Sequence, residues 1–276
     1  MKQIINISLI MLLVVSGCKK EEDVVNVNTN TNNFTPTIMT CVKGIILGID
    51  GEPISGVNVN IEGVSQTTSE KGLFFFNDIN ISTDRAIIFF EKDGYFRTSR
   101  ALEANEGVTN YLRLVLDQKQ VDATVNSSSG ASLTLSNGIS LNLRSGSYYY
   151  NDGSAYYGDI NVSVNKISPG GANFSMRIPG GDLRAITMTG DDMRLYSYGM
   201  LDVVLTDNNG EKINTGSNTQ ISFPIPNNML ADAPSQIPLW YYDELTGIWI
   251  EEGSAVRSGN EYIGDVSHFS YWNWDL

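Results

Sequence analysis

Hydrophobic and polar residues alternate in short runs along most of this chain. Val57, Val59 and Ile61 face one side at period two, residues 86–90 are a continuous apolar run, and residues 133–143 alternate around Asn137-Gly138. Period-two runs are typical of half-buried strands, and Asn-Gly between two of them is a strong hairpin signal. No stretch of 12 or more residues has a convincing helical period. The pattern therefore predicts an all-β fold.

The spacing of these runs divides the chain into two folded parts. From 37 to 117 the strands are short, evenly spaced and separated by turns such as Asp50-Gly51 and Asp93-Gly94, which predicts a β-sandwich. A Ser-, Gly- and Asn-rich stretch at 126–130 follows the first strand of the second part. We expect one domain at 37–117 and a second all-β, sandwich-type domain at 118–276.

The first 18 residues have the layout of a bacterial lipoprotein signal. Lys2 precedes a mostly apolar stretch, Ile4–Val15, which is shorter than the roughly 20 residues that a membrane-spanning helix needs. Small residues then lead to Cys18, and this segment resembles a lipobox. The resemblance implies cleavage after residue 17 and acylation of Cys18, which would be the membrane anchor. A plain secretory signal with a coincidental cysteine, or a buried amphipathic segment, is the alternative.

Residues 18–36 are expected to form a flexible tether, because they contain few large apolar residues and no period. As a coil, residues 19–36 would reach roughly 20–25 Å. Lys19–Asp23 resembles the charged tag that directs some Bacteroidetes lipoproteins to the outer face of the outer membrane, although an ordinary solvated tether fits as well. We therefore expect an outer-membrane, lipid-anchored protein that faces outward.

Charge and composition narrow the classes of function. The 276 residues carry 18 basic and 31 acidic side chains, and the net charge of −13 disfavours binding to nucleic acid. His268 is the only histidine, and Cys18 and Cys41 are the only cysteines. Zinc sites built from His and Cys and a disulfide framework are therefore excluded. We expect no metal, no cofactor and, for Cys41, a place at the start of a strand.

The first part contains four motifs in order: Val42-Lys43-Gly44, Asp50-Gly51-x-Pro53-x-x-Gly56-Val57-x-Val59-x-Ile61, Thr68-x-x-x-Gly72-x-Phe74 and Lys92-x-Gly94-Tyr95. Together they resemble the carboxypeptidase regulatory-like domain. This resemblance implies a transthyretin-like, seven-stranded sandwich that is the non-catalytic partner of a peptidase, and the single histidine leaves no His-x-x-Glu zinc pair here.

The second part contains a series of short motifs: Pro179-Gly180-x-Asp182, Ser197-Tyr198-Gly199-Met200, Pro238-Leu239-Trp240-x-x-Asp243, Gly247-x-Trp249 and His268-Phe269-Ser270-x-Trp272. Together they resemble an all-β module of Bacteroidetes surface lipoproteins and, more distantly, the cartilage intermediate layer protein family. This resemblance implies an extracellular, non-enzymatic interaction protein.

Candidate chemistry is sparse, and we expect no catalytic residues. His268 lacks a nucleophile motif, and the acidic pairs Asp191-Asp192 and Glu251-Glu252 fit solvated loops better than a glycosidase pair. Asp/Asn/Gly loops could hold calcium, but ordinary turns use the same residues. A tyrosine-rich segment could stack on sugars, with cross-strand aromatic pairing as the simpler interpretation. Its candidate ligand-binding residues are Tyr148, Tyr149, Tyr150, Tyr156 and Tyr157.

These observations lead to three functional hypotheses. The first is a non-enzymatic outer-membrane lipoprotein that acts as a cell-surface binding or structural module, with a glycan or a surface protein as partner. The second is a carbohydrate-binding accessory of a polysaccharide-uptake system. The third, which has the least support, is a carboxylate-dependent hydrolase.

Overall fold

A computed structural model describes residues 36–276, and it confirms the all-β prediction. The predicted signal peptide (1–17), Cys18 and nearly all of the tether lie outside the described residues. In the described part, the single helix is α1 (Phe174–Arg177), which is one turn long. No helix among residues 36–276 combines the length and apolar character that crossing a bilayer requires.

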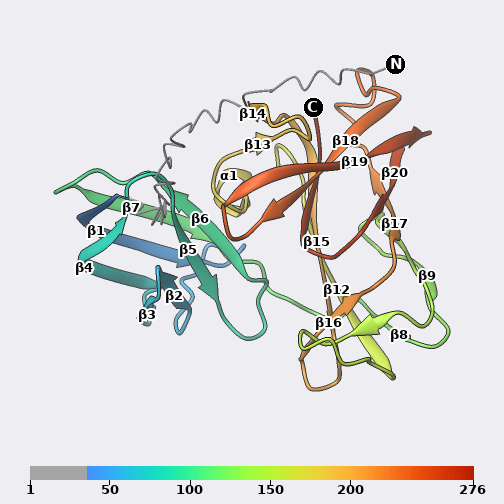
Figure 1. Ribbon diagram of the computed structural model, residues 1–276, viewed down its shortest axis with the longest axis horizontal. Coiled ribbons are helices and arrows are strands. Elements are labelled where there is room, and N and C mark those ends of the chain that lie inside the picture. The colour runs from blue at the N-terminus through green and yellow to red at the C-terminus, as the bar shows by residue number, and fades with distance from the viewer. Residues whose placement is uncertain (1–35) are drawn as a thin grey trace, which may run out of the picture. The chain divides into compact units, whose positions relative to one another are not determined.

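The first part of the chain is a sandwich of seven strands in two sheets. One sheet has the order β4-β1-β7 and the other the order β3-β2-β5-β6 (Figure 1). All neighbours are antiparallel except β1 and β7, which run parallel. The strands are β1 (Thr37–Leu47), β2 (Asn58–Ile61), β3 (Val64–Thr67), β4 (Leu73–Ser82), β5 (Ala86–Glu91), β6 (Thr98–Leu102) and β7 (Thr109–Val115).

The sandwich core comes from the alternating positions of both sheets. Val59 and Ile61 of β2 are fully buried together with Phe74 of β4 and Phe90 of β5, and the rings of Phe74 and Phe90 meet edge to face at 5.9 Å. Phe74 lies directly over Gly44 of β1, where a Cβ atom would come within 2.6 Å of its ring. The glycine of the Val42-Lys43-Gly44 motif thus makes room for a core phenylalanine.

Cys41 lies inside β1 rather than at its start, because that strand already begins at Thr37. Residues 37–40 pair with the far end of β4, where Thr37 is opposite Ser82. Because residues 37 and 40 are polar, the hydrophobic pattern does not show that the strand extends this far. The buried Thr40 hydroxyl donates to the carbonyl of Val108 at 2.7 Å, which satisfies it within the sandwich.

The second part of the chain forms a branched sheet of 14 strands. Its longest path has the order β11-β16-β15-β21-β18-β19-β20-β17-β10-β9, and β8, β12, β13 and β14 branch from it. The strands are β8 (Ala123–Asn126), β9 (Ala131–Thr134), β10 (Ser140–Leu143), β11 (Tyr148–Tyr149), β12 (Asp159–Ile167), β13 (Arg184–Ile186), β14 (Asp192–Arg194), β15 (Ser197–Thr206), β16 (Lys212–Thr215), β17 (Thr219–Pro224), β18 (Gln236–Asp243), β19 (Ile248–Ser258), β20 (Glu261–Val266) and β21 (Tyr271–Asp275).

The hairpin predicted at Asn137-Gly138 joins β9 and β10. Thr134 pairs with Ser140, and Leu133 with Leu141, in antiparallel register. Gly138 has a φ of 85°, which a glycine adopts without strain, and the Asn137 side chain accepts a hydrogen bond from the backbone N–H of Ile139. The local sequence therefore accounts for this turn.

The final strand of the sheet, β21, has two neighbours. It lies between β15 and β18, so it fills the middle of the sheet. Trp272 and Trp274 are both fully buried, and Trp274 stacks on Phe223 of β17 at 4.5 Å. This strand therefore ties the sheet to the main core of the second part.

Polar groups connect the sandwich to the second sheet, and residues 36–276 belong to one compact unit. Arg100 of β6 is buried and donates to the carbonyls of Ile178 (2.5 Å) and Met176. Beside it, the N–H of Ala101 donates to the carbonyl of Gly180, and the N–H of Gly180 to that of Ser99. The Pro179-Gly180 motif is thus a backbone contact to β6. The division into domains at residue 117 stays a prediction.

Candidate functional site

The tyrosine segment does not present its five rings as one surface. Tyr148 is buried and its hydroxyl donates to the carbonyl of Arg144 at 2.7 Å, whereas Tyr157 is 80% exposed. Tyr150 and Tyr156 meet edge to face at 5.4 Å across the Asn151–Gly153 turn, which is the cross-strand pairing considered as the simpler interpretation. Tyr149 is 37% exposed. A role for these residues in ligand binding stays a prediction.

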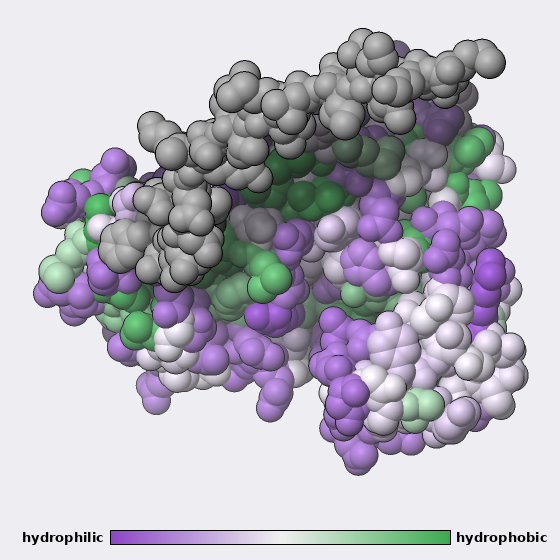
Figure 2. Space-filling view, viewed as in Figure 1, coloured by the Kyte–Doolittle hydropathy of each residue, from purple (hydrophilic) through white to green (hydrophobic). Residues whose placement is uncertain are grey.

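Figure 2 shows how this region appears at the surface. Hydrophilic residues cover much of the visible face, and residues of near-neutral hydropathy gather around β8, β9 and β16 at its lower right. This agrees with the Ser-, Gly-, Asn- and Tyr-rich composition of that part of the sequence.

His268 lies half-buried beside the core of the second sheet. Its ring is 4.9 Å from that of Tyr241 and 5.2 Å from that of Trp272, and burial lowers its pKa. The Ser267 hydroxyl donates to Glu252 at 2.5 Å and lies 2.9 Å from His268 Nδ1. Since the Ser267 proton is directed to Glu252, this arrangement lacks the serine-to-histidine proton path of a catalytic triad. Its geometry fits the structural role expected for His268.

The side chains of the acidic pairs form hydrogen bonds and an ion pair with neighbouring groups. Asp192 forms an exposed ion pair with Arg184 at 2.8 Å, and Asp191 accepts a hydrogen bond from Thr189 at 2.6 Å. Glu251 accepts from the backbone N–H of Met188. No group of three or more His, Cys, Asp or Glu side chains in the described residues is arranged to hold a metal ion.

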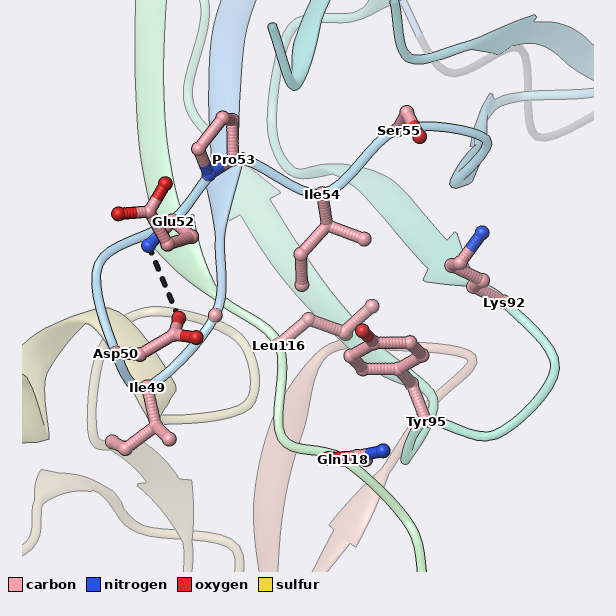
Figure 3. A pocket seen from close by; sticks show the side chains of 11 residues that line it. Ile49, Asp50, Glu52, Pro53, Ile54, Ser55, Lys92, Tyr95, Leu116 and Gln118 are labelled. Atoms are coloured by element: carbon pink, nitrogen blue, oxygen red, sulfur yellow. Dashed lines mark hydrogen bonds between the residues drawn. The ribbon is translucent and has the colours of Figure 1, made fainter. Parts of the chain in front are cut away.

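A cavity of about 260 Å³ opens at one end of the sandwich (Figure 3). Ile54 and Leu116 form its apolar part, with Tyr95 beside them. Asp50 and Glu52 lie on one side and Lys92 on the other, so opposite charges border the cavity at a distance from one another. The Asp50 carboxylate accepts a hydrogen bond from the N–H of Glu52 at 3.1 Å, which uses one of its oxygens to close the Asp50-Gly51 turn.

A second hollow, of about 380 Å³, lies on the outer face of the β4-β1-β7 sheet. Lys43 is in the centre of one cross-strand row, with Phe75 of β4 and Tyr111 of β7 as its partners. Phe75 is 49% exposed and Tyr111 77% exposed, and the Lys43 ammonium lies 5.9 Å from the centre of the Phe75 ring. We call this surface the cationic face; its side chains are Lys43, Ile45, Leu73, Phe75, Tyr111 and Arg113.

Sequence analysis identified Lys43 only as part of a fold motif and missed this surface. The rows of the face combine residues from β1, β4 and β7, and the two pairings that bring them together are long-range. The alternation in β1 predicts that Lys43 and Ile45 point the same way, but it does not identify their neighbours. The signal available in the sequence was the exposed phenylalanine within the Phe74–Phe76 run.

Comparison with known proteins gives limited similarity. No family model matches the chain. It is 30% identical over 120 residues to cartilage intermediate layer protein 1 of Sus scrofa, a match that covers 41% of this chain and 19% of that protein. The chain thus spans about a fifth of the length of this curated relative. The match agrees with the resemblance to the cartilage intermediate layer protein family, although it does not show membership of that family.

Solved structures show only a distant likeness. A protein of unknown function from Bacteroides fragilis, designated membrane-associated, is 8% identical with a TM-score of 0.26; the alignment covers 87% of this chain and 98% of that one. A protein from Bacteroides uniformis, designated carbohydrate-binding, is 11% identical with a TM-score of 0.22, over 83% and 98% of the two chains.

Proposed function

We propose that this chain is a lipid-anchored, outward-facing outer-membrane protein that acts as a non-enzymatic binding module. The lipobox-like segment before Cys18 and the charged residues 19–23 support the location. The observation that supports binding most directly is the cationic face, where two large aromatic side chains remain exposed beside Lys43. Exposed apolar groups gathered in a hollow are typical of interaction sites.

Binding and anchoring can be tested together in intact cells. The wild-type protein should incorporate a labelled fatty acid, and Cys18→Ser should lose both the label and membrane association. Surface cross-linking should then capture a partner with wild type, and Tyr111→Ala should capture much less of it. Tyr196→Ala is the matched control, since Tyr196 is an exposed tyrosine outside the cationic face. Equal capture of a partner by wild type, Tyr111→Ala and the control variant would contradict this binding site.

A carbohydrate-binding accessory role is the second candidate. The specific observation in its favour is the Phe75–Lys43–Tyr111 row, because aromatic rings that flank a hydrogen-bond donor suit a sugar, which has apolar C–H faces and polar edges. Sugar-dependent quenching of tyrosine fluorescence that disappears in Tyr111→Ala would support this role. Hydrolysis of a glycan that is lost on changing Asp191-Asp192 or Glu251-Glu252 would instead support the hydrolase hypothesis.

A further inference from the structure

We infer that the cationic face binds acidic polysaccharides, with its aromatic rings against sugar faces and its cations on uronate carboxylates. This inference rests on the proposed binding function and adds the ligand class. The site is a hollow of about 380 Å³, a size within the range of small-ligand sites.

The aromatic side chains set the geometry of the site. Phe75, Lys43 and Tyr111 occupy one row across three neighbouring strands. Strands lie about 4.8 Å apart, so the backbone positions of Phe75 and Tyr111 are separated by roughly 10 Å. Two rings at this separation are too far apart to stack on a single sugar, but they can contact two different sugar units of one chain. A linear polymer is therefore a better fit than a single monosaccharide.

The charged side chains indicate the sign of the ligand's charge. Lys43 and Arg113 are the only ionisable cations of the face, and none of the residues that line the hollow is acidic. Neither cation belongs to an ion pair of the described residues. This local positive charge contrasts with a net charge of −13 for the chain. Two unpaired cations next to exposed rings therefore favour a ligand that carries carboxylates.

The two cations lie in neighbouring rows of the face. Lys43 is between the two rings, whereas Arg113 is opposite Ile45, two residues along β1 from Lys43. The two rows are separated by roughly 6.6 Å along the strands. A guanidinium can bind a carboxylate through two parallel hydrogen bonds, and an ammonium binds it as a point charge. The face can therefore hold one carboxylate on Lys43, between the rings, and another on Arg113, beside a sugar chain that lies across the rings.

Other polyanions fit this surface less well. Nucleic acid needs many phosphate contacts, and the strongly acidic remainder of the chain would repel it. Attraction to an anionic lipid surface likewise requires a cluster of several basic residues. A face with two cations and two exposed rings suits a polymer that has widely spaced charges and apolar sugar faces.

The test uses the purified full-length lipoprotein in detergent and three acidic glycans: polygalacturonate, alginate and hyaluronan. The neutral counterpart is fully methyl-esterified polygalacturonate, which keeps the backbone and removes the charge. We expect at least one acidic glycan to bind about tenfold or more tightly than the neutral polymer, a difference of about 1.4 kcal/mol. Added salt should weaken this binding.

Variants assign the binding to the face. Lys43→Gln with Arg113→Gln should reduce affinity for the acidic glycan to that for the neutral one, and Tyr111→Ala should weaken binding of both. Arg184→Gln and Tyr196→Ala alter exposed side chains elsewhere and should leave binding unchanged. Unchanged melting temperatures would show that the variants are folded.

Two results would overturn the inference. Binding of none of the three acidic glycans refutes the ligand class; if the cross-linked cell-surface partner is still lost in Tyr111→Ala, the proposed binding function survives this failure. Glycan binding that persists in the Lys43, Arg113 and Tyr111 variants refutes the site.

Discussion

At the scale of single residues, the second sheet buries two carboxyl groups that the sequence pattern did not mark. Asp202 of β15 lies opposite Tyr271 of β21 and Asn165 of β12, and burial raises its pKa to about 7. Burial also raises the pKa of Asp275 to about 8. Both groups are therefore protonated in the folded protein at a pH where they ionise in the unfolded chain.

The pH dependence of stability follows from these shifts. A group whose pKa is raised by folding stabilises the protein below its unfolded pKa, and this contribution is lost as the pH rises through the folded value. We expect the contribution of Asp202 to the stability of the folded protein, measured as melting temperature, to fall as the pH rises from about 4 to 7. Asp202→Asn should melt higher than wild type at about pH 8 and show a flatter pH profile in calorimetry.

Asp84→Asn serves as the control for this measurement, because Asp84 is an exposed carboxylate on the sandwich. Its pH profile should match that of wild type. A wild-type profile identical to that of Asp202→Asn would show that the buried carboxyl group does not titrate as expected.

Trp272 supports a second prediction at this scale. Its ring is fully buried and its Nε1–H donates to the carbonyl of His268 at 2.9 Å. Trp272→Ala should destabilise the protein by about 3–5 kcal/mol in denaturant unfolding, as large core truncations do. His268→Gln should cost far less. A His268→Gln protein of normal stability that lacks a specific activity would reopen the enzyme hypothesis.

At the scale of elements, Arg100 holds β6 against the segment before β13. Burial lowers the pKa of Arg100 to about 10, so the side chain stays charged at neutral pH. Its substitution by methionine leaves the Met176 and Ile178 carbonyls without their donor. We expect Arg100→Met to lower the free energy of unfolding by about 2–3 kcal/mol. The variant should also melt in two transitions where wild type melts in one.

Arg184→Met is the comparison for Arg100→Met. Arg184 forms an exposed ion pair with Asp192, and such pairs contribute about 0–1 kcal/mol. If Arg184→Met lost as much stability as Arg100→Met, burial of the Arg100 contacts would not explain the effect of removing them.

Local patterns predicted individual strands and turns, whereas long-range pairing decided what they build. The Asn137-Gly138 hairpin and the short strands of the sandwich follow from alternation and turn residues, whereas their number, seven, was implied by the resemblance to the carboxypeptidase regulatory-like domain. The parallel pairing of β1 with β7 and the place of β21 join residues that are far apart in the sequence. The cationic face depends on the first of these pairings, so the sequence pattern could not reveal it.

At the scale of the whole molecule, the proposed location depends on residues before the described part. Replacing Lys19–Asp23 with neutral residues should leave the protein lipidated but protected from protease added to whole cells, if this segment is the export tag. Wild type should be degraded under the same conditions. Equal protection of both proteins would remove the cell-surface assignment and keep the lipid anchor.

The central position of β21 has a consequence for how the chain is delivered. Ser197 of β15 donates to Asn273 of β21 at 2.6 Å, across 76 residues of sequence. A chain exported with its N-terminus first presents β15 and β18 before residues 271–275 arrive, and their facing edges then have no partner. Open edges invite pairing with other chains, and long-range contacts form slowly. Under the proposed outer-membrane location, export of this protein should therefore depend on a periplasmic holdase until β21 has crossed.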